Sequence, residues 1–204
     1  MRTVAIVNYG MSNVDSVARA VEECGGHPVV TSAAAELERA AAIILPGVGA
    51  YPDAMRNLRA RGLEDVLREQ VVERRIPFLG ICLGMQMLAT VGWEVEETRG
   101  LGWVPGEVRR LPAVPGVRIP HIGWNEVEIT RETPLLTGIE SGVDFYFVHS
   151  YHFVCHDSTH EVARTPYCGG FTSAITKENI FGTQFHPEKS QKRGFQLLRN
   201  FLAA

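Results

Sequence analysis

The segment 76–89 constrains the fold more strongly than any other part of this 204-residue sequence. It opens with a short, unbroken apolar run, which predicts a strand buried on both faces, as strands are in a parallel sheet. After Cys82 the apolar side chains change to a helical spacing, with Leu83, Met87 and Val91 at positions i, i+4 and i+8. The sequence therefore predicts that a buried strand turns into a helix at Cys82.

The turn at Cys82 has the pattern of a nucleophile elbow, in which a reactive side chain stands between a strand and a helix. Gly80 and Gly84 flank it, and residues without a side chain let the two backbones approach closely. A thiol at a helix N-terminus meets unpaired N–H groups, which favour the reactive thiolate. The alternative is a buried structural cysteine, because free cysteine also packs as a small hydrophobic residue.

Strands and helices alternate through the first half of the chain, which predicts a mostly parallel sheet with helices on both faces. The second half has short strand-like segments between proline and glycine turns, and then an amphipathic helix. We therefore expect an open α/β sheet, extended by antiparallel strands, in a single domain over residues 1–204. The expected strands are 3–7, 28–31, 42–45, 76–81, 102–111, 117–120, 126–129, 144–149, 152–155, 161–164, 171–176 and 180–185, and the expected helices are 13–24, 33–40, 53–61, 63–75, 83–91 and 190–202.

The composition excludes several classes of function. Charged residues make up 21% of the chain and the net charge is −3, so no basic surface for nucleic acid is indicated. No run of about 18 apolar residues predicts a membrane span, and the apolar start of the chain is too short for a signal peptide, so we expect a cytoplasmic protein. The cysteines form no C-x-x-C pair, so neither a zinc framework nor a redox motif is indicated. They are Cys24, Cys82, Cys155 and Cys168.

Ligand sites in open α/β sheets form at the carboxyl ends of the strands, where loops 8–13 and 46–50 and Cys82 are expected to meet. The end of the last predicted strand supplies His186 and Glu188, two residues apart. In an extended backbone such side chains point to one side, and a carboxylate beside an imidazole can fix its tautomer. They would complete a Cys–His–Glu triad. An isolated His-x-Glu pair is also typical of a surface salt bridge, and the sequence alone does not place it beside the cysteine.

The loop Pro46–Ala50 is a candidate oxyanion segment, because glycine allows backbone conformations that aim an N–H group at a developing negative charge. Val48 and Gly49 would supply one donor, and Leu83, which follows the nucleophile, a second. A phosphate-binding loop is the competing interpretation, but the lysine of a Walker motif and the spacing of a dinucleotide fingerprint are missing. A metal site on the histidines between 149 and 160 is not favoured, since their spacings scatter over both faces of strands.

Several motifs together make the chain resemble the class I glutamine amidotransferases. Gly80-x-Cys82-x-Gly84-x-Gln86 and, near the C-terminus, Gln184-Phe-His-Pro-Glu188 match the triad signature of that family in type and in order. Further segments resemble the glutaminase subunits of imidazole glycerol phosphate synthase, and they span nearly the whole chain. These segments are Asn8–Asn13, Leu45–Gly49, Pro120–Asn125, Tyr146–Tyr151 and His186–Ser190.

The resemblance implies a flavodoxin-like amidotransferase fold and the hydrolysis of glutamine to glutamate and ammonia. Cys82 would attack the side-chain carbonyl of glutamine, and His186, held by Glu188, would protonate the leaving ammonia. Neither a metal nor another cofactor is implied. The positions that match glutamine-binding residues of the family are Gln86, Ser150 and Tyr151.

The resemblance also implies a partner, a separate cyclase subunit with which the chain would form a heterodimer. The cyclase would use the ammonia to make imidazole glycerol phosphate and AICAR in histidine biosynthesis, and hydrolysis would stay slow until it docks. The segments expected at the interface lie at the carboxyl edge of the sheet or flank the triad. Their candidate contact residues are Tyr9, Asn13, Trp124, Asn125 and Lys189.

Two other interpretations stay open on the sequence. The chain could be the glutaminase component of another synthase, such as anthranilate synthase, although segments 120–125 and 146–151 argue against it. It could also be a catalytically idle binding or scaffold subunit. The complete set of Cys82, His186 and Glu188 argues against that interpretation.

Overall fold

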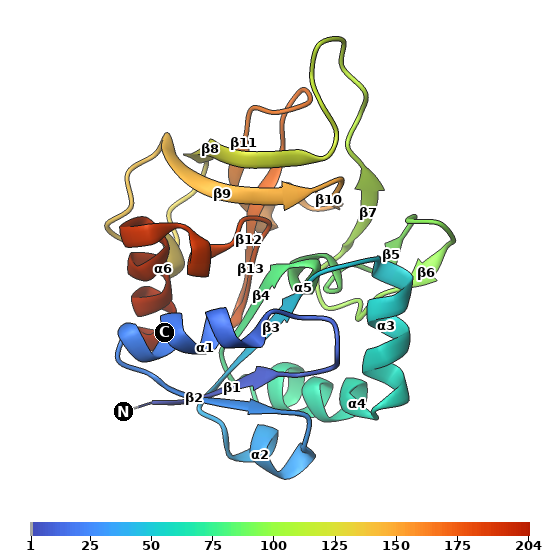
Figure 1. Cartoon of the computed structure of the whole chain (residues 1–204). Helices are drawn as coiled ribbons and strands as arrows, with labels where there is room; N and C mark the ends of the chain where they lie inside the picture. Colours follow the sequence, from blue (N-terminus) through green and yellow to red (C-terminus); the bar gives the residue numbers. More distant parts are fainter. Residues whose placement is uncertain (1) are drawn as a thin grey trace.

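The computed structural model describes residues 2–204 and is built around a nine-stranded mixed sheet, in the order β2-β1-β3-β4-β13-β12-β11-β8-β9 (Figure 1). The first five strands in this order are parallel: β2 (His27–Thr31), β1 (Thr3–Val7), β3 (Ala42–Gly47), β4 (Phe78–Cys82) and β13 (Ile180–Thr183). The others are antiparallel: β12 (Phe171–Lys177), β11 (Glu161–Thr165), β8 (His121–Ile129) and β9 (Val143–His149). The α/β fold with added antiparallel strands is therefore confirmed.

Helices cover both faces of the parallel strands (Figure 1). On one face pack α1 (Val14–Glu23) and α6 (Gln191–Ala203), which contribute Val21 and Leu198 to a buried apolar core. On the other face α2 (Ala34–Arg39), α3 (Tyr51–Ala60) and α4 (Leu63–Arg68) contribute Leu37, Leu58 and Leu67 to a second core, and a π-helical turn (Glu69–Glu73) extends α4. Every residue of β3 and β4 is buried between the two cores, as their unbroken apolar runs predict.

A second, four-stranded sheet lies beside the main one, and the sequence did not indicate it. Its order is β10 (Tyr151–Cys155), β7 (Gly106–Arg110), β5 (Val91–Gly92) and β6 (Thr98–Arg99). The segments 102–111 and 152–155 were expected to extend the main sheet, but they pair with each other instead. Gly106 lies directly against the ring of Phe153, where a side chain would collide, so glycine at this position lets the Phe153 ring pack over the paired strands.

The helix after Cys82 is much shorter than its apolar spacing predicts. α5 contains only Leu83–Gln86, and Val91 lies in β5. Met87 and Leu88 are completely buried, so apolar side chains pack on all sides and their spacing does not mark one helix face. The strand expected at 117–120 is also wrong, because this segment is a loop that ends in a proline without an N–H for a ladder.

The parallel strands bring four loops to one edge of the sheet. Gly47 pairs with Cys82 at the ends of β3 and β4, and Thr183 pairs with Ile81 at the ends of β13 and β4. The residues that follow these strands therefore converge, and the segment with His186 lies next to the turn at Cys82. Among residues 2–204, no helix is both long and apolar enough to cross a membrane.

Candidate active site

Cys82 occupies a strained turn between β4 and α5. Its φ of 54° and ψ of −110° are unfavourable for a residue with a side chain, and such strain is kept mainly at functional sites. The turn brings α5 so close to β3 that a Cβ atom on Gly84 would lie 1.8 Å from the carbonyl oxygen of Leu45. Only glycine can occupy that position. This is the sharp turn from strand to helix that the sequence predicts.

His186 and Glu188 form a buried pair. His186 Nδ1 and Glu188 Oε1 are 2.8 Å apart, and each side chain is only 3% exposed, which contradicts a surface salt bridge. The hydroxyl of Ser190 donates to the His186 carbonyl oxygen at 2.6 Å and holds the 3₁₀ turn Pro187–Lys189 in place. His186 Nε2 is buried and bonds to no other group of residues 2–204, so it is free to act on a substrate.

The surroundings of His186 favour its protonated form. Burial lowers the pKa of His186, but the neighbouring Cys82 and Glu188 raise it, and the resulting pKa is about 10. Because this pKa lies above the ordinary value of 6.5, His186 is an imidazolium at neutral pH. A buried imidazolium next to a cysteine is an arrangement that can serve both proton transfer and nucleophilic attack.

Two buried glutamines connect Cys82 to the neighbouring wall of the site. Gln184 Nε2 donates toward Cys82 Sγ over 3.5 Å, and Gln184 Oε1 accepts from Gln86 Nε2 at 3.0 Å. Gln86 Nε2 also donates to the Tyr151 carbonyl oxygen at 2.8 Å. We did not predict Gln184. Its position two residues before His186, on the same side of an extended segment, was the signal that could have found it.

A cavity of about 230 Å³ opens beside Cys82. Its lining contains residues predicted for the nucleophile, the oxyanion segment and glutamine binding, namely Val48, Gly49, Cys82, Leu83, Gln86, Ser150 and Tyr151. Glu94, Val148 and His149 also line it and were not predicted. Burial raises the pKa of Glu94, whose carboxylate accepts a 2.8 Å hydrogen bond from the Tyr51 N–H. Glu94 lies in a loop outside every motif, so no sequence signal pointed to it.

The candidate oxyanion segment is not fully turned toward the cavity. Gly49 has a φ of +104°, a conformation that residues with side chains rarely adopt. The Val48 N–H donates to the Met11 carbonyl oxygen at 2.9 Å, so the loop after β1 holds it in this conformation. The Leu83 N–H lies in the first turn of α5, where a helix offers no acceptor. The Leu83 N–H can therefore donate to an oxyanion in this conformation, whereas the Val48 N–H could do so only after its peptide group rotates.

Comparison with known proteins decides the family. A family model described as glutamine amidotransferase class-I matches residues 5–204. The imidazole glycerol phosphate synthase subunit HisH of Moorella thermoacetica is 47% identical, over 98% of this chain and 94% of that protein. The HisH subunits of Aquifex aeolicus and Cereibacter sphaeroides are 46% and 45% identical, over 98% and 97% of this chain and 96% of each relative. The chain belongs to the HisH family of class I glutamine amidotransferases.

As a HisH amidotransferase, the chain is the glutaminase subunit of imidazole glycerol phosphate synthase, an enzyme of histidine biosynthesis. The resemblance seen in the sequence motifs is thereby confirmed. Solved structures agree on the fold. PurLQS from Thermotoga maritima superimposes with a TM-score of 0.75 at 21% identity, over 100% of this chain and 99% of the other. A solved glutamine amidotransferase gives a TM-score of 0.73 at 21% identity, over 98% and 97% of the two chains.

One residue expected to dock the partner of this amidotransferase lies inside the molecule. Tyr9 is completely buried, and a Cβ atom on Gly47 would lie 2.3 Å from its hydroxyl. Burial raises the pKa of Tyr9, and the nearby charge of Cys82 raises it further. The expectation of a partner contact through the Tyr9 side chain is therefore wrong, because the loop after β1 turns the ring inward beneath Gly47.

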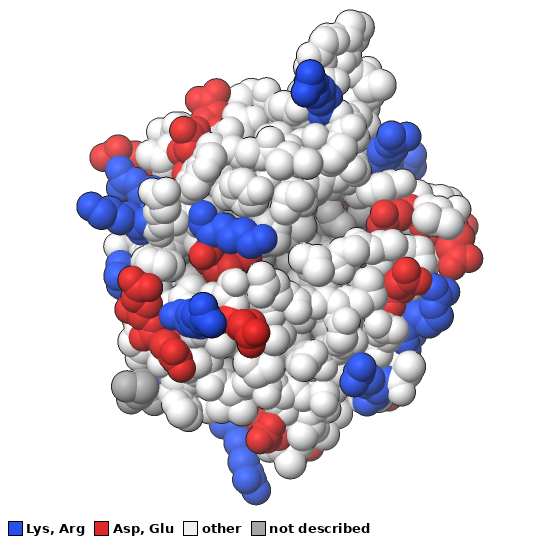
Figure 2. Space-filling view, in the orientation of Figure 1, with Lys and Arg blue, Asp and Glu red and all other residues white. Residues whose placement is uncertain are grey.

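The other expected docking residues of the amidotransferase are at least partly exposed. Trp124 is 48% exposed and meets Tyr146 edge-on, with ring centroids 6.0 Å apart, and Lys189 Nζ lies 5.9 Å from the Tyr146 ring centroid. Asn13 is exposed at the start of α1, and Asn125 is half-buried. Figure 2 shows charged side chains at the rim and over the left half of the view, with an uncharged, hollowed area near the centre.

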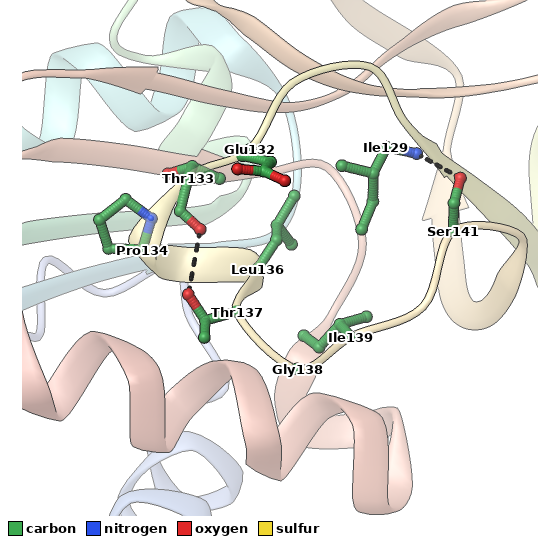
Figure 3. Close-up of a pocket in the computed structure, with 9 residues that line it drawn as sticks. All are labelled: Ile129, Glu132, Thr133, Pro134, Leu136, Thr137, Gly138, Ile139 and Ser141. Carbon is green, nitrogen blue, oxygen red and sulfur yellow. Dashed lines mark hydrogen bonds between the residues drawn. The ribbon is translucent and has the colours of Figure 1, made fainter.

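The amidotransferase has another cavity, of about 770 Å³, near α6 (Figure 3). It is formed around the 3₁₀ helix Pro134–Leu136, and Glu132, Thr133 and Thr137 supply its polar groups. It contains neither a cysteine nor a histidine, so it lacks the groups that amide hydrolysis requires. Within the described part of the chain, no group of three metal-binding side chains is close enough to hold a metal ion.

Proposed function

We propose that Cys82, His186 and Glu188 perform the glutamine hydrolysis of this subunit. The observation that carries the proposal is the convergence of two features: a strained, buried cysteine that lines a small cavity, and a buried His–Glu pair that follows the neighbouring strand β13. A thiolate can attack an amide carbonyl, but an amide leaves only after its nitrogen gains a proton. The protonated His186 supplies the proton that this reaction needs.

In the first half of the reaction, Cys82 Sγ bonds to the side-chain carbonyl carbon of glutamine, and the carbonyl oxygen becomes an oxyanion. His186 Nε2–H then protonates the amide nitrogen, the carbon–nitrogen bond breaks, and ammonia leaves behind a thioester on Cys82. In the second half, neutral His186 removes a proton from water, which attacks the thioester. Glutamate departs, Cys82 regains its electron pair and His186 its proton. Glu188 keeps the imidazole oriented throughout and stabilises its charge.

The cavity beside Cys82 supports the binding of glutamine in one orientation. The Glu94 carboxylate lines it and can pair with the α-ammonium group of the substrate. Ser150 and Tyr151 also line it, and Gln86 is held by its hydrogen bond to the Tyr151 carbonyl oxygen. A carboxylate and several fixed dipoles distinguish an amino acid from a simple amide.

The oxyanion would be stabilised by the Leu83 N–H and by an N–H of the Val48–Gly49 segment. Because the Val48 N–H is bonded to the Met11 carbonyl oxygen in this conformation, the Val48 donor would become available only when the loop changes. A subunit that lacks one oxyanion donor should hydrolyse glutamine slowly. This supports the expectation that the isolated chain is nearly inactive.

Replacing Gly49 with valine is expected to lower turnover about 10²–10³-fold, the usual cost of one oxyanion donor. At a φ of +104° a β-branched residue is strained, and its Cβ would lie 2.7 Å from Met11 Cε. The KM for glutamine should change much less, since the strain affects a group used mainly in the transition state. Steady-state glutamate release by the docked subunit measures both constants. Unchanged turnover with a raised KM would identify a binding loop instead.

We infer that the partner is the cyclase subunit of the synthase, in a cytoplasmic heterodimer with this chain as one domain, and that ammonia passes directly to it. The names of the relatives describe a subunit of imidazole glycerol phosphate synthase, and the sequence has no motif for a phosphorylated substrate. Trp124, Tyr146 and Lys189 offer an aromatic and cationic docking surface. The Tyr146 carbonyl accepts the His186 N–H at 2.9 Å, so this surface is bonded directly to the triad segment.

The proposed function is tested by glutamate release from glutamine, measured for the isolated chain and for its complex with the cyclase. The isolated chain should be near background, and docking with the cyclase substrate or an analogue should raise the rate by orders of magnitude. Full activity of the isolated chain would contradict the proposed dependence on docking. No glutamate release under either condition would contradict the hydrolysis itself.

Replacing Trp124 with alanine is expected to weaken docking by about 10–100-fold, because an exposed tryptophan at an interface commonly supplies 1–3 kcal/mol or so. Lys189→Ala should raise the ratio of glutamate formed to cyclase product formed above one, since it loosens the surface next to the triad. Arg39→Ala, which removes an exposed cation on α2, is the control. Titration with the cyclase and product stoichiometry measure these effects, and unchanged values for both variants would exclude this docking surface.

A further inference from the structure

Two buried histidines outside the triad form a hydrogen-bonded relay across β8 and β9. His149 Nδ1 lies 2.8 Å from the Tyr151 carbonyl oxygen, and His149 Nε2 lies 3.0 Å from His121 Nδ1. His121 Nε2 lies 3.1 Å from Asn125 Nδ2. The relay therefore runs from a half-buried residue of the candidate docking strand to the wall of the glutamine cavity.

The acceptors in the relay define where each proton lies. A carbonyl oxygen can only accept, so His149 Nδ1 must carry a proton, and its neutral ring must accept at Nε2. His121 must then donate from Nδ1 and accept at Nε2, where the Asn125 amide donates. Every group is paired, and all the donors point toward Tyr151.

Burial keeps both rings uncharged. It lowers the pKa of His121 to about 4 and that of His149 to about 3, where the neighbouring His121, His152 and His186 also oppose a positive charge. The ring of His121 is further fixed by stacking on Tyr167, with centroids 3.9 Å apart. The relay therefore neither titrates near neutral pH nor has a free lone pair for a proton or a metal ion.

The end of the relay coincides with the residues that form the substrate cavity. The Tyr151 carbonyl oxygen accepts from both His149 and Gln86, each at 2.8 Å. Gln86 in turn donates to Gln184, whose amide group reaches Cys82. A shift of the Tyr151 carbonyl would therefore move the wall of the glutamine cavity. It would also move the two amide side chains, Gln86 and Gln184, that connect this wall to Cys82.

We propose that His121 and His149 are positioning residues for glutamine, which hold the Tyr151 carbonyl and Gln86 in place from the docking strand. This inference rests on the proposed function of the cavity. The proposal also gives Asn125, a candidate docking residue, a second role. Its side-chain amide is the first hydrogen-bond donor of the relay. His121 acts through His149, and His149 acts through the Tyr151 carbonyl and Gln86, although its ring also lines the cavity.

The first test compares two replacements of His149 in the complex with the cyclase. His149→Phe keeps a buried ring but removes the donor, and the KM for glutamine should rise about tenfold, the effect of one lost hydrogen bond. His149→Asn keeps a donor at the position of Nδ1, so its KM should lie closer to that of the wild type. Turnover at saturating glutamine should fall less than the KM rises. Product formation from added ammonium should stay unchanged, which shows that both complexes remain folded.

His152→Phe is the matched control, because His152 is a half-buried histidine next to Tyr151 but outside the relay. Its KM for glutamine should equal that of the wild type. Equal KM values for wild type and His149→Phe, or equal defects in the Phe and Asn variants, would overturn the positioning role. If the wild-type complex itself hydrolyses no glutamine, the proposed function fails first.

A second measurement needs no variant. Nitrogen-15 NMR of the histidine rings in the complex should show both His121 and His149 as neutral, with the proton on Nδ1. Histidines with the proton on Nε2, or charged rings at neutral pH, would contradict the relay.

Discussion

Replacement of Cys82 with alanine is expected to lower glutamine hydrolysis by about 10⁴-fold or more, because the reaction loses its nucleophile and the thioester cannot form. The change removes one sulfur atom and allows a backbone conformation no worse than that of cysteine, so the subunit should fold and dock normally. The Cys82→Ala complex should therefore still make product when ammonium is added directly. Parallel assays with glutamine and with ammonium measure the two activities.

The comparison is informative because the chain contains three other free cysteines. Cys168→Ala is the matched control, since Cys168 is also buried but lies away from the cavity. It should keep full glutamine-dependent activity. Retention of that activity by Cys82→Ala would show that the nucleophile has been assigned to the wrong residue.

Replacement of His186 with alanine should impair hydrolysis about as severely as loss of Cys82, because members of a triad act as a unit. Glu188→Gln should cost less, about 10²–10⁴-fold, since the amide still occupies the site but no longer stabilises the imidazolium. Single-turnover rates with glutamine rank the three variants. A Glu188→Gln variant slower than both others would mean that the carboxylate itself takes part in proton transfer.

The same variants have a pH signature. The pKa of His186 is raised from 6.5 to about 10 in the folded chain. The stabilisation from the charged His186–Glu188 pair is therefore complete below pH 6.5, and it is lost as the pH rises from 6.5 to about 10. Glu188→Gln removes one of the charges that raise this pKa. The loss of stability on going from pH 7 to pH 10 should therefore be smaller in the variant than in the wild type, as thermal unfolding at each pH would show.

The parallel half of the fold follows from local patterns. The apolar run of β4 and the glycines around Cys82 were enough to predict a strand and a sharp turn, because both depend on neighbouring residues. The length of α5 depends instead on packing from all sides, which leaves no polar face in the sequence. The second sheet was missed for a similar reason, since Gly106 matters only through the distant ring of Phe153.

In the candidate site too, some features follow from the local sequence and others depend on the tertiary fold. His186 and Glu188 were recognisable as a pair from their spacing, but their approach to Cys82 depends on β13 pairing with β4, which no local pattern encodes. Tyr9 was placed on the docking surface because its loop lies at the carboxyl edge of the sheet, although its own ring packs beneath Gly47. Glu94 enters the cavity through a loop whose course is set by the tertiary fold.

The most direct test of the catalytic assignment is labelling of the docked subunit with a chloroketone analogue of glutamine, followed by peptide mass spectrometry. The nucleophile should attack the analogue in place of the substrate carbonyl and retain it. We expect one label, on Cys82, that is prevented by excess glutamine and strongly slowed in His186→Ala. Labelling of Cys24, Cys155 or Cys168 instead, or continued glutamine hydrolysis by fully labelled protein, would contradict the assignment.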